Sequence, residues 1–437
     1  MRATPATLEA TTGEDSCQSL LWAEINRIFE DLPRNGESRV LEVAFEHLRD
    51  DKLVSALEQT NWTGRPPRYP AKVLWRTIVA KQMLGIETFA GLRRELDVEK
   101  NPFVARLCGI WSKDEIPKKW TYSRFLRKLI RFEGLVRECV ARMVEALQAE
   151  IPGFGRVVAV DATPIHAWSN PRKKRGPRFD QDARRGVKGK EDEDKWFGYK
   201  AHLIADAVHE LPIMVEVIPP TADPGIPHES PHLLPLLKRT KEAIPTLAPS
   251  HVLTDAGYDA NENYKGIVEE VRAIPIIDLN LRGRKGKPPR FEDIADEEGT
   301  PYCAAMRPYT FWGYDRKQKA LKYRCPLATG KQGCLWIEKC SGSPYGQVVK
   351  IKLSNDYRRF IQVPRHTKKW KALKKKRVAI ERTFSRSKGF RTLEKPTVRG
   401  LDRVTLHCLT SILAMQAWAL AMIKLGQPER IRSCVHG

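Results

Sequence analysis

Val157-Val158-Ala159-Val160-Asp161-Ala162 is a short, almost continuous apolar run with one carboxylate near its end. From about Ser38 to Leu147, by contrast, apolar residues recur at the three- and four-residue spacing of helices. The period changes at Arg156, so the run predicts a buried strand that begins a second domain. We therefore expect an all-α N-terminal domain over residues 1–150.

Strand and helix patterns alternate after this first strand. Strand patterns at Tyr199 to Ala205 and Ile213 to Ile218, with a turn at 208–212, predict an antiparallel meander. The segment before them, Arg172 to Lys190, has the composition of a basic loop. Further elements are predicted for a helix at His232 to Ala243, a strand at His251 to Asp255, a helix at Glu262 to Val271 and a strand at Ile274 to Ile277. Together these patterns indicate an α/β fold, a mixed sheet flanked by helices.

A segment without a clear period interrupts this order. Residues 282–290 are rich in Gly, Pro and positive charge, and no helical or strand period follows until about Trp370. A helix is then predicted from Lys371 to about Lys388, and a strongly apolar one from about Arg399 to Lys424. The expected division is a second domain at 151–281 and 371–426, with an insertion at 282–370.

Composition restricts the class of partner. The chain has 437 residues, with 76 Lys and Arg against 53 Asp and Glu, a formal net charge of +23. This surplus of positive charge favours binding to nucleic acid, because each phosphate that a cation neutralises releases condensed counterions. The basic polar faces of the N-terminal helices either contact DNA or are ordinary solvated faces, and both interpretations stay open.

Neither a membrane segment nor export is predicted. The longest apolar run, Cys408 to Ile423, is short for a bilayer span and contains Thr410, Ser411 and Gln416. It therefore predicts a buried helix. The amino terminus has no apolar signal core, so an intracellular location is expected.

Three carboxylates form the candidate site. Asp161 and Asp255 each end an apolar strand pattern, where an Asp is unfavourable unless it is hydrogen bonded or binds a metal. Glu381 lies on the helix predicted to begin at Lys371, with apolar neighbours that can partly face the sheet. Two-metal phosphoryl transfer requires carboxylate oxygens of this kind. The alternatives are capping aspartates, and an exposed glutamate that pairs with Arg377 one helical turn away.

These motifs resemble those of DDE transposases. The resemblance rests on Val160-Asp161-Ala162-Thr163, on Thr254-Asp255-Ala256-Gly257-Tyr258-Asp259 and on the helix of Glu381, and it covers roughly Arg156 to Lys395. It implies a ribonuclease-H-like catalytic domain in which Asp161, Asp255 and Glu381 hold two Mg²⁺ ions, or Mn²⁺ in vitro. It also implies the transposase of a bacterial insertion sequence, cytoplasmic and associated with the nucleoid. Such enzymes nick the element ends and join them to target DNA as homo-oligomers on paired ends.

One branch of that family carries a Tyr-x2-Arg-x3-Glu-x6-Lys signature. Arg377, Glu381 and Lys388 match it, whereas Lys374 stands where the signature has its tyrosine. The resemblance implies that Arg377 and Lys388 bind DNA phosphates, and a cation at 374 suits a phosphate as well. It also implies that Thr163 supports the first motif. Two alternatives remain: a nuclease of the same fold without strand transfer, and a DNA-binding regulator or inactive remnant.

A basic run leads into the helix of Glu381. Arg365 to Arg377 holds eight cations and no acid, so substrate phosphates would find counter-charges there. Trp168 and Trp370 stand beside basic runs. Each either stacks on an unpaired base or is a structural tryptophan.

Two further patterns concern metals. The insertion contains Cys303, Cys325, Cys334 and Cys340, whose loose spacing predicts either a structural Zn²⁺ site or free thiols. His228-Glu229-Ser230-Pro231-His232 fits the zinc-protease pattern HExxH, which needs a helix. Pro231 disfavours that helix, so the pattern is expected to straddle a helix start and a protease is not favoured.

Overall fold

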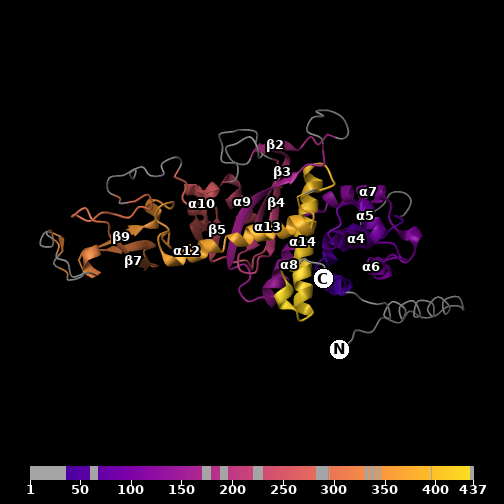
Figure 1. The fold of residues 1–437 in the computed structure, drawn as a ribbon, viewed down its shortest axis with the longest axis horizontal. Coiled ribbons are helices and arrows are strands. Elements are labelled where there is room, and N and C mark those ends of the chain that lie inside the picture. Colours follow the sequence, from indigo (N-terminus) through magenta and orange to yellow (C-terminus); the bar gives the residue numbers. More distant parts are fainter. Residues whose placement is uncertain are drawn as a thin grey trace.

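The protein is elongated, with helices at one end, a large sheet in the middle and a small sheet at the other end (Figure 1). This computed structural model describes residues 36–59, 67–169, 179–187, 195–219, 230–281, 294, 296–329, 334, 336, 340, 341, 343, 346–394 and 396–433. The strands and helices of the middle part carry all three predicted carboxylates.

Helices form the amino-terminal part, as the spacing of apolar residues between Ser38 and Leu147 predicted. The helices found in the described residues are α2 (Gly36–His47), α3 (Asp51–Glu58), α4 (Ala71–Met83), α5 (Phe89–Glu95), α6 (Pro102–Leu107), α7 (Lys119–Ile130) and α8 (Glu133–Glu150). Their buried side chains belong to the same continuous hydrophobic core as those of the large sheet. The two parts are therefore packed together rather than joined by a linker.

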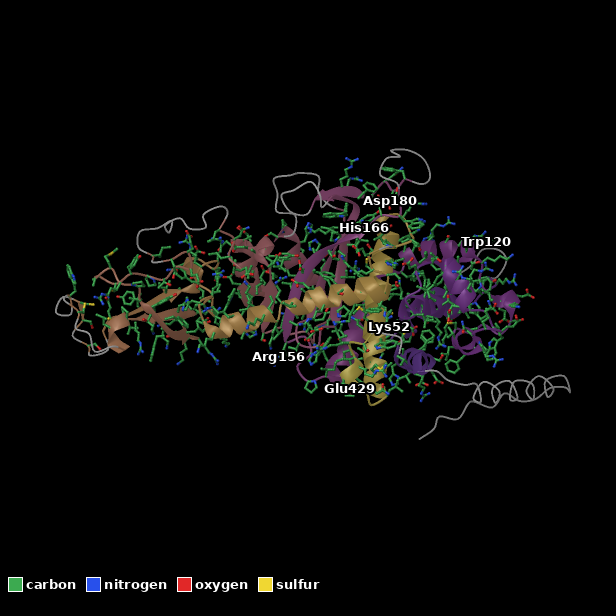
Figure 2. All side chains as sticks on the ribbon, viewed as in Figure 1. Lys52, Trp120, Arg156, His166, Asp180 and Glu429 are labelled. Carbon is green, nitrogen blue, oxygen red and sulfur yellow. The ribbon has the colours of Figure 1, made fainter. Side chains whose placement is uncertain are left out.

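The large sheet is mixed. β1 (Val157–His166), β3 (Lys195–Asp206) and β4 (Pro212–Ile218) are antiparallel neighbours, as the meander prediction requires. β5 (His251–Thr254) is parallel to β1, and β6 (Ile274–Ile277) is parallel to β5. The strand order is β4-β3-β1-β5-β6. Arg156, just before β1, and His166, its last residue, mark the two ends of that strand (Figure 2).

A sixth strand corrects one prediction. β2 (Arg184–Val187) pairs with the start of β3, within the segment that had been assigned to a loop. Its residues Arg-Arg-Gly-Val form no apolar run, unlike those of the equally short β5 and β6, and pairing with β3 is what extends them. Gly186 lies directly on the Trp196 indole, and a Cβ at this position would approach the ring to 2.3 Å. Other residues of the predicted loop, 172–178 and 188–190, lie outside the described residues.

Helices cover both faces of the large sheet. Neighbours along a strand point to opposite faces, so Leu203 shares a face with its partner Asp161, and His202 points to the other. His202 contacts His232, which directly precedes α9 (Leu233–Ala243), whereas α13 packs on the Asp161 face. The connection between β5 and β6 is α10 (Asn261–Gly266) followed by a π-helical turn at Ile267–Val271.

The longest helix in the described residues, α14 (Leu401–Lys424), is a core helix. It is long and apolar enough to cross a membrane, but 94% of its apolar window is buried inside the protein. It packs against α2, α4, α8 and β4, and so joins the helical part to the sheet. The prediction of a buried helix is confirmed.

The predicted helix from Lys371 to Lys388 is two helices. α12 (Lys368–Lys375) and α13 (Val378–Phe390) lie end to end (Figure 1). At the junction, the amides of Lys376 and Arg377 donate to carbonyls three residues back instead of four, both at 2.9 Å. This tighter turn ends α12 and makes Arg377 the N-cap residue of α13.

The segment between β6 and α12 also contains regular structure that the sequence analysis missed. β7 (Thr310–Asp315), β8 (Ala320–Arg324) and β9 (Val348–Lys352) form an antiparallel sheet. Its core consists of Tyr309, Leu321, Tyr323 and Leu353. A bulge between Phe311 and Gly313 breaks the alternation of β7, which is why no strand period was recognised.

Candidate active site

Asp161 lies on β1, and Asp255 directly follows the adjacent strand β5. The parallel register of β1 and β5 pairs Val157 with His251 and Ala159 with Leu253. Extended two residues beyond this paired stretch, the same register aligns Asp161 with Asp255. Both residues are partly buried, and neighbouring strands are about 4.8 Å apart. The structure therefore brings together the two aspartates that the sequence placed 94 residues apart.

A third aspartate extends this row. Thr254 of β5 pairs with Ile277 of β6, so the next level joins Asp255 and Asp278. Asp278 was missed in the sequence analysis, although it follows an apolar strand in the same way as Asp255. Lys374 Nζ lies 2.5 Å from Asp278 Oδ1. One of the predicted phosphate-binding cations is thus held at the end of this row.

Glu381 reaches the row through Arg377. The guanidinium of Arg377 contacts Glu381 Oε1 at 2.6 Å through Nη2 and Asp161 Oδ2 at 3.5 Å through Nη1. The i, i+4 pair considered as an alternative for Glu381 is therefore present. Because its side chain is 52% exposed, Glu381 is not fixed by packing. Arg377 supplies the positive charge that these two carboxylates need near the sheet.

The capping alternative for Asp255 is also present. Its Oδ1 accepts a hydrogen bond from the Gly257 amide at 2.9 Å at the start of the turn Ala256–Tyr258. Asp161 Oδ1 accepts one from its neighbour Ala162 at 2.8 Å. A carboxylate has two oxygens and about four acceptor sites, so a cap and a metal ligand are compatible in one side chain.

A buried histidine of β3 contacts the turn that follows Asp255. Tyr258 Oη, three residues after Asp255, lies 3.3 Å from His202 Nδ1 on β3. Burial lowers the pKa of His202 to about 3, and the nearby His232 and Lys200 add to the effect. His202 is therefore neutral near pH 7. A lone histidine inside a strand pattern gives no sequence signal for this role.

The HExxH pattern contributes no helical metal motif in the described residues. Ser230–His232 form a 3₁₀ turn and α9 begins only at Leu233, as Pro231 led us to expect. His228 and Glu229 lie outside the described residues. His232 itself stacks beside His202, with 5.2 Å between the ring centroids.

Glu210 holds the helix that carries Glu381. It lies in the β3–β4 turn with a φ of 58°, and its carboxylate contacts Arg382 and Arg386, both at 2.8 Å. Its carbonyl accepts a hydrogen bond from Thr383 Oγ1 at 3.0 Å. Burial would raise the pKa of Glu210, but the two guanidinium groups outweigh burial and lower it. The sequence analysis had treated this residue only as part of a turn.

The other predicted DNA-binding residue, Lys388, is not beside Asp161. Its Nζ lies 3.3 Å from Glu394 Oε1, and the Glu394 carbonyl accepts the amide of His166 at the far end of β1. The three cations of the signature positions are thus spread along α12 and α13. Of the two tryptophans, Trp370 is buried in the core, which favours the structural interpretation, whereas Trp168 is exposed.

The donor set suits a hard divalent ion in chemistry, since carboxylate oxygens are its preferred ligands. Within the described residues, however, no group of three or more His, Cys, Asp and Glu side chains is close enough to hold a metal. Arg377 occupies the position between Asp161 and Glu381 instead. The three carboxylates are therefore of the ligand type that a divalent metal needs. Arg377 has to move from its place between Asp161 and Glu381 before these two can bind the same ion.

The four predicted zinc ligands are free cysteines. Cys303, Cys340 and Cys325 all lie near Tyr309, whose pKa is raised first by burial and then by these thiols. In the part of the chain that the structure describes, they do not form a metal-holding group. The zinc site stays a prediction without support from this geometry.

Comparison with known proteins identifies a family. Residues 152–416 match the family described as "Transposase DDE domain". Among solved structures, the chain is similar to the cryo-EM structure of a piggyBac transposase synaptic complex with hairpin DNA. The two are 10% identical with a TM-score of 0.40, over 91% of this chain and 78% of that chain. No curated protein matches the sequence.

Proposed function

Because this chain belongs to the transposase DDE domain family, we propose that it is the transposase of a bacterial insertion sequence. It would nick the ends of its element and join them to target DNA. The observation that carries the proposal is the parallel register of β1 and β5, which, extended past Thr254, aligns Asp161 on β1 with Asp255 directly after β5. Arg377 links Glu381 to this row through Asp161.

We assign Asp161, Asp255 and Glu381 as the residues that would hold two divalent ions, magnesium or, in vitro, manganese. When bound, such ions activate the attacking oxygen and stabilise the leaving oxygen of a phosphoryl transfer. Arg377 would then exchange its carboxylate partners for a phosphate of the DNA, since a guanidinium binds both kinds of oxygen in the same geometry. Lys374 and Lys388 would hold phosphates on either side of it.

The finer family features belong to the same proposal. Three antiparallel strands followed by two parallel ones, with helices on both faces, support a ribonuclease-H-like catalytic domain at 151–281 and 371–426. Arg377, Glu381 and Lys388 support the branch with the Tyr-Arg-Glu-Lys signature. A helical domain at 1–150, an insertion at 282–370, a homo-oligomer on paired ends and a cytoplasmic, nucleoid-associated location complete it.

The test is a cleavage and joining assay. The purified protein is incubated with Mg²⁺ and the DNA ends that flank its gene, beside Glu381→Gln and the matched control Glu429→Gln. Glu429 is an exposed carboxylate of the turn Pro428–Arg430, after α14 (Figure 2). Joined products made by the parent and by the control, but not by Glu381→Gln, support the transposase.

The rivals give different results in the same assay. Mg²⁺-dependent cuts without joined products would assign a nuclease. Binding without cleavage by any of the proteins would assign a regulator or an inactive remnant. Both outcomes contradict the proposed function.

A further inference from the structure

The three-stranded sheet has one covered face and one open face. Phe311, Tyr323 and Ile351 point toward its small core. Their neighbours along the strands point the other way and remain wholly or partly exposed: Thr310, Trp312, Lys322, Arg324, Val348 and Lys350. We call this second set the open face. Among the helices and strands of the described residues, none other makes extensive contact with β7, β8 or β9.

The open face is strongly basic. Three of its six residues are cations, and the hairpin 310–324 and β9 together contain seven Lys and Arg residues and one acid, Asp315. Lys322 and Lys350 are direct register partners on β8 and β9. Like charges placed opposite each other destabilise a sheet. Asp315, 2.9 Å from Lys350 Nζ, offsets part of this repulsion.

Exposed apolar groups lie among these cations. Trp312 is 57% exposed and Val348 is 52% exposed. Trp312 occupies the bulge of β7, which turns its indole outward. The guanidinium carbon of Arg324 lies 3.1 Å from the centre of the indole ring, so the cation is held against a rigid support. Solubility alone does not require a guanidinium group held against an exposed indole ring.

The open face is held in a fixed relation to the candidate active site. Arg358, shortly after β9, makes a two-pronged contact with the buried carboxylate of Asp259, at 2.7 and 3.0 Å. Asp259 follows Asp255 by four residues. Arg365 donates to the carbonyl of Ile277, next to Asp278, at 3.2 Å. Between the sheet and Glu381 runs the lysine-rich helix α12 (Figure 1).

We infer that the open face binds the phosphate backbone of duplex DNA that extends beyond the site of Asp161 and Asp255. The inference rests on the proposed function, since it takes DNA as the substrate. Phosphates would relieve the Lys322–Lys350 repulsion and contact the Arg324 guanidinium. The contacts go to the backbone, so the affinity they add is independent of base sequence and falls with salt.

The test uses the full-length protein and a double variant, Lys322→Gln with Lys350→Gln. Its control is Lys424→Gln with Arg430→Gln, at and just after the end of α14, which removes the same charge. Each double variant breaks one ion pair, Lys350 with Asp315 or Lys424 with Glu150. Binding to a duplex of random sequence is measured by fluorescence anisotropy over a range of salt concentrations. Cleavage of the element ends is measured on the same samples.

We expect the open-face variant to bind about tenfold more weakly, with a salt slope smaller by about two, while the control is unchanged. Thermal unfolding should change little, because removing the facing like charges offsets the loss of the Lys350–Asp315 ion pair. Unchanged binding by a variant whose parent still binds and cuts DNA would overturn this inference and leave the proposed function intact.

Two other outcomes are also decisive. A change of oligomeric state in the open-face variant, measured by light scattering without DNA, would make the face a contact between copies of the chain and overturn the inference. Failure of the parent to bind or cut any DNA would contradict the proposed function first, and the inference with it.

Discussion

The two sheets of this protein place their charges in different positions. In the large sheet, α9 and α13 lie on opposite faces, and strands β5 and β6 are buried almost throughout. Of its three aligned aspartates, Asp161 lies in the middle of β1, whereas Asp255 and Asp278 directly follow β5 and β6. In the small sheet one face is open, and Lys322 and Lys350 lie in the middle of β8 and β9, with Arg324 at the end of β8.

The difference follows from desolvation. A charge inside a sheet covered on both faces loses its water, so a carboxylate there needs polar partners, as Asp161 has in the Ala162 amide and the Arg377 guanidinium. An open face leaves each cation in contact with solvent, and the cost of placing it there is small. The large sheet can thus form a compact site for chemistry, and the small sheet a broad surface for a polyanion.

The largest effect is expected from the loss of one carboxylate in the row formed by Asp161, Asp255 and Asp278. Asp255→Asn removes one carboxylate charge but keeps the side chain's shape and its acceptor for the Gly257 amide. Cleavage of DNA ends should fall by at least about a hundredfold, the size of effect seen when one electrostatic stabiliser is removed. Single-turnover cleavage with Mg²⁺ measures it, and DNA affinity should not fall. Retained cleavage would remove Asp255 from the site.

The second prediction compares the two cores. Leu409→Ala in α14 should lower the free energy of unfolding by about 2–5 kcal/mol, since Leu409 is fully buried. Leu321→Ala in the small core should instead loosen β7–β9 and leave the main thermal transition in place. Thermal denaturation and limited proteolysis, read together, separate the two. A common shift of the main transition would show that the sheets unfold as one unit.

The third prediction concerns the position of α13. Glu210→Gln leaves the guanidinium groups of Arg382 and Arg386 without their carboxylate and should cost roughly 1–3 kcal/mol. Because the pKa of Glu210 is lowered in the folded protein, its stabilisation is present above the ordinary value of 4.5 and is lost as the pH falls through the folded-state pKa. Urea denaturation at pH 7 and at pH 4 should show a smaller difference between parent and variant at pH 4.

The smallest expected effect is at Lys374. Lys374→Ala removes one cation of the basic run Arg365 to Arg377 and also its contact with Asp278. DNA affinity should fall only a few-fold, and the salt slope by about one, as for a single phosphate contact. Anisotropy titrations measure both. An unchanged slope would show that Lys374 serves Asp278 and not the DNA.

Much of the fold could be predicted because its signals are local. Residues that are close in the sequence show the apolar period of β1 and β5. The same holds for the helices before residue 151 and after residue 400. The three-stranded sheet was missed because one strand contains a bulge and because its strands carry polar residues on the open face, whereas the shorter β5 and β6 are almost wholly buried apolar runs. The break between α12 and α13 was missed because both sides have good helix formers, and only the hydrogen bonds of Lys376 and Arg377 reveal it.

By itself, the sequence determined which carboxylates belong to apolar strand patterns, and with that Asp161 and Asp255 as candidates. The prediction that Asp161 ends its strand was wrong, because β1 continues to His166. Only the tertiary structure decided that they are level with each other, that Asp278 joins their row, and that Arg377 stands between Asp161 and Glu381. It also decided that Glu210 holds α13. The reason is physical: a period of two or 3.6 residues is a property of one segment, whereas register and ion pairs arise between segments that meet only when the core closes.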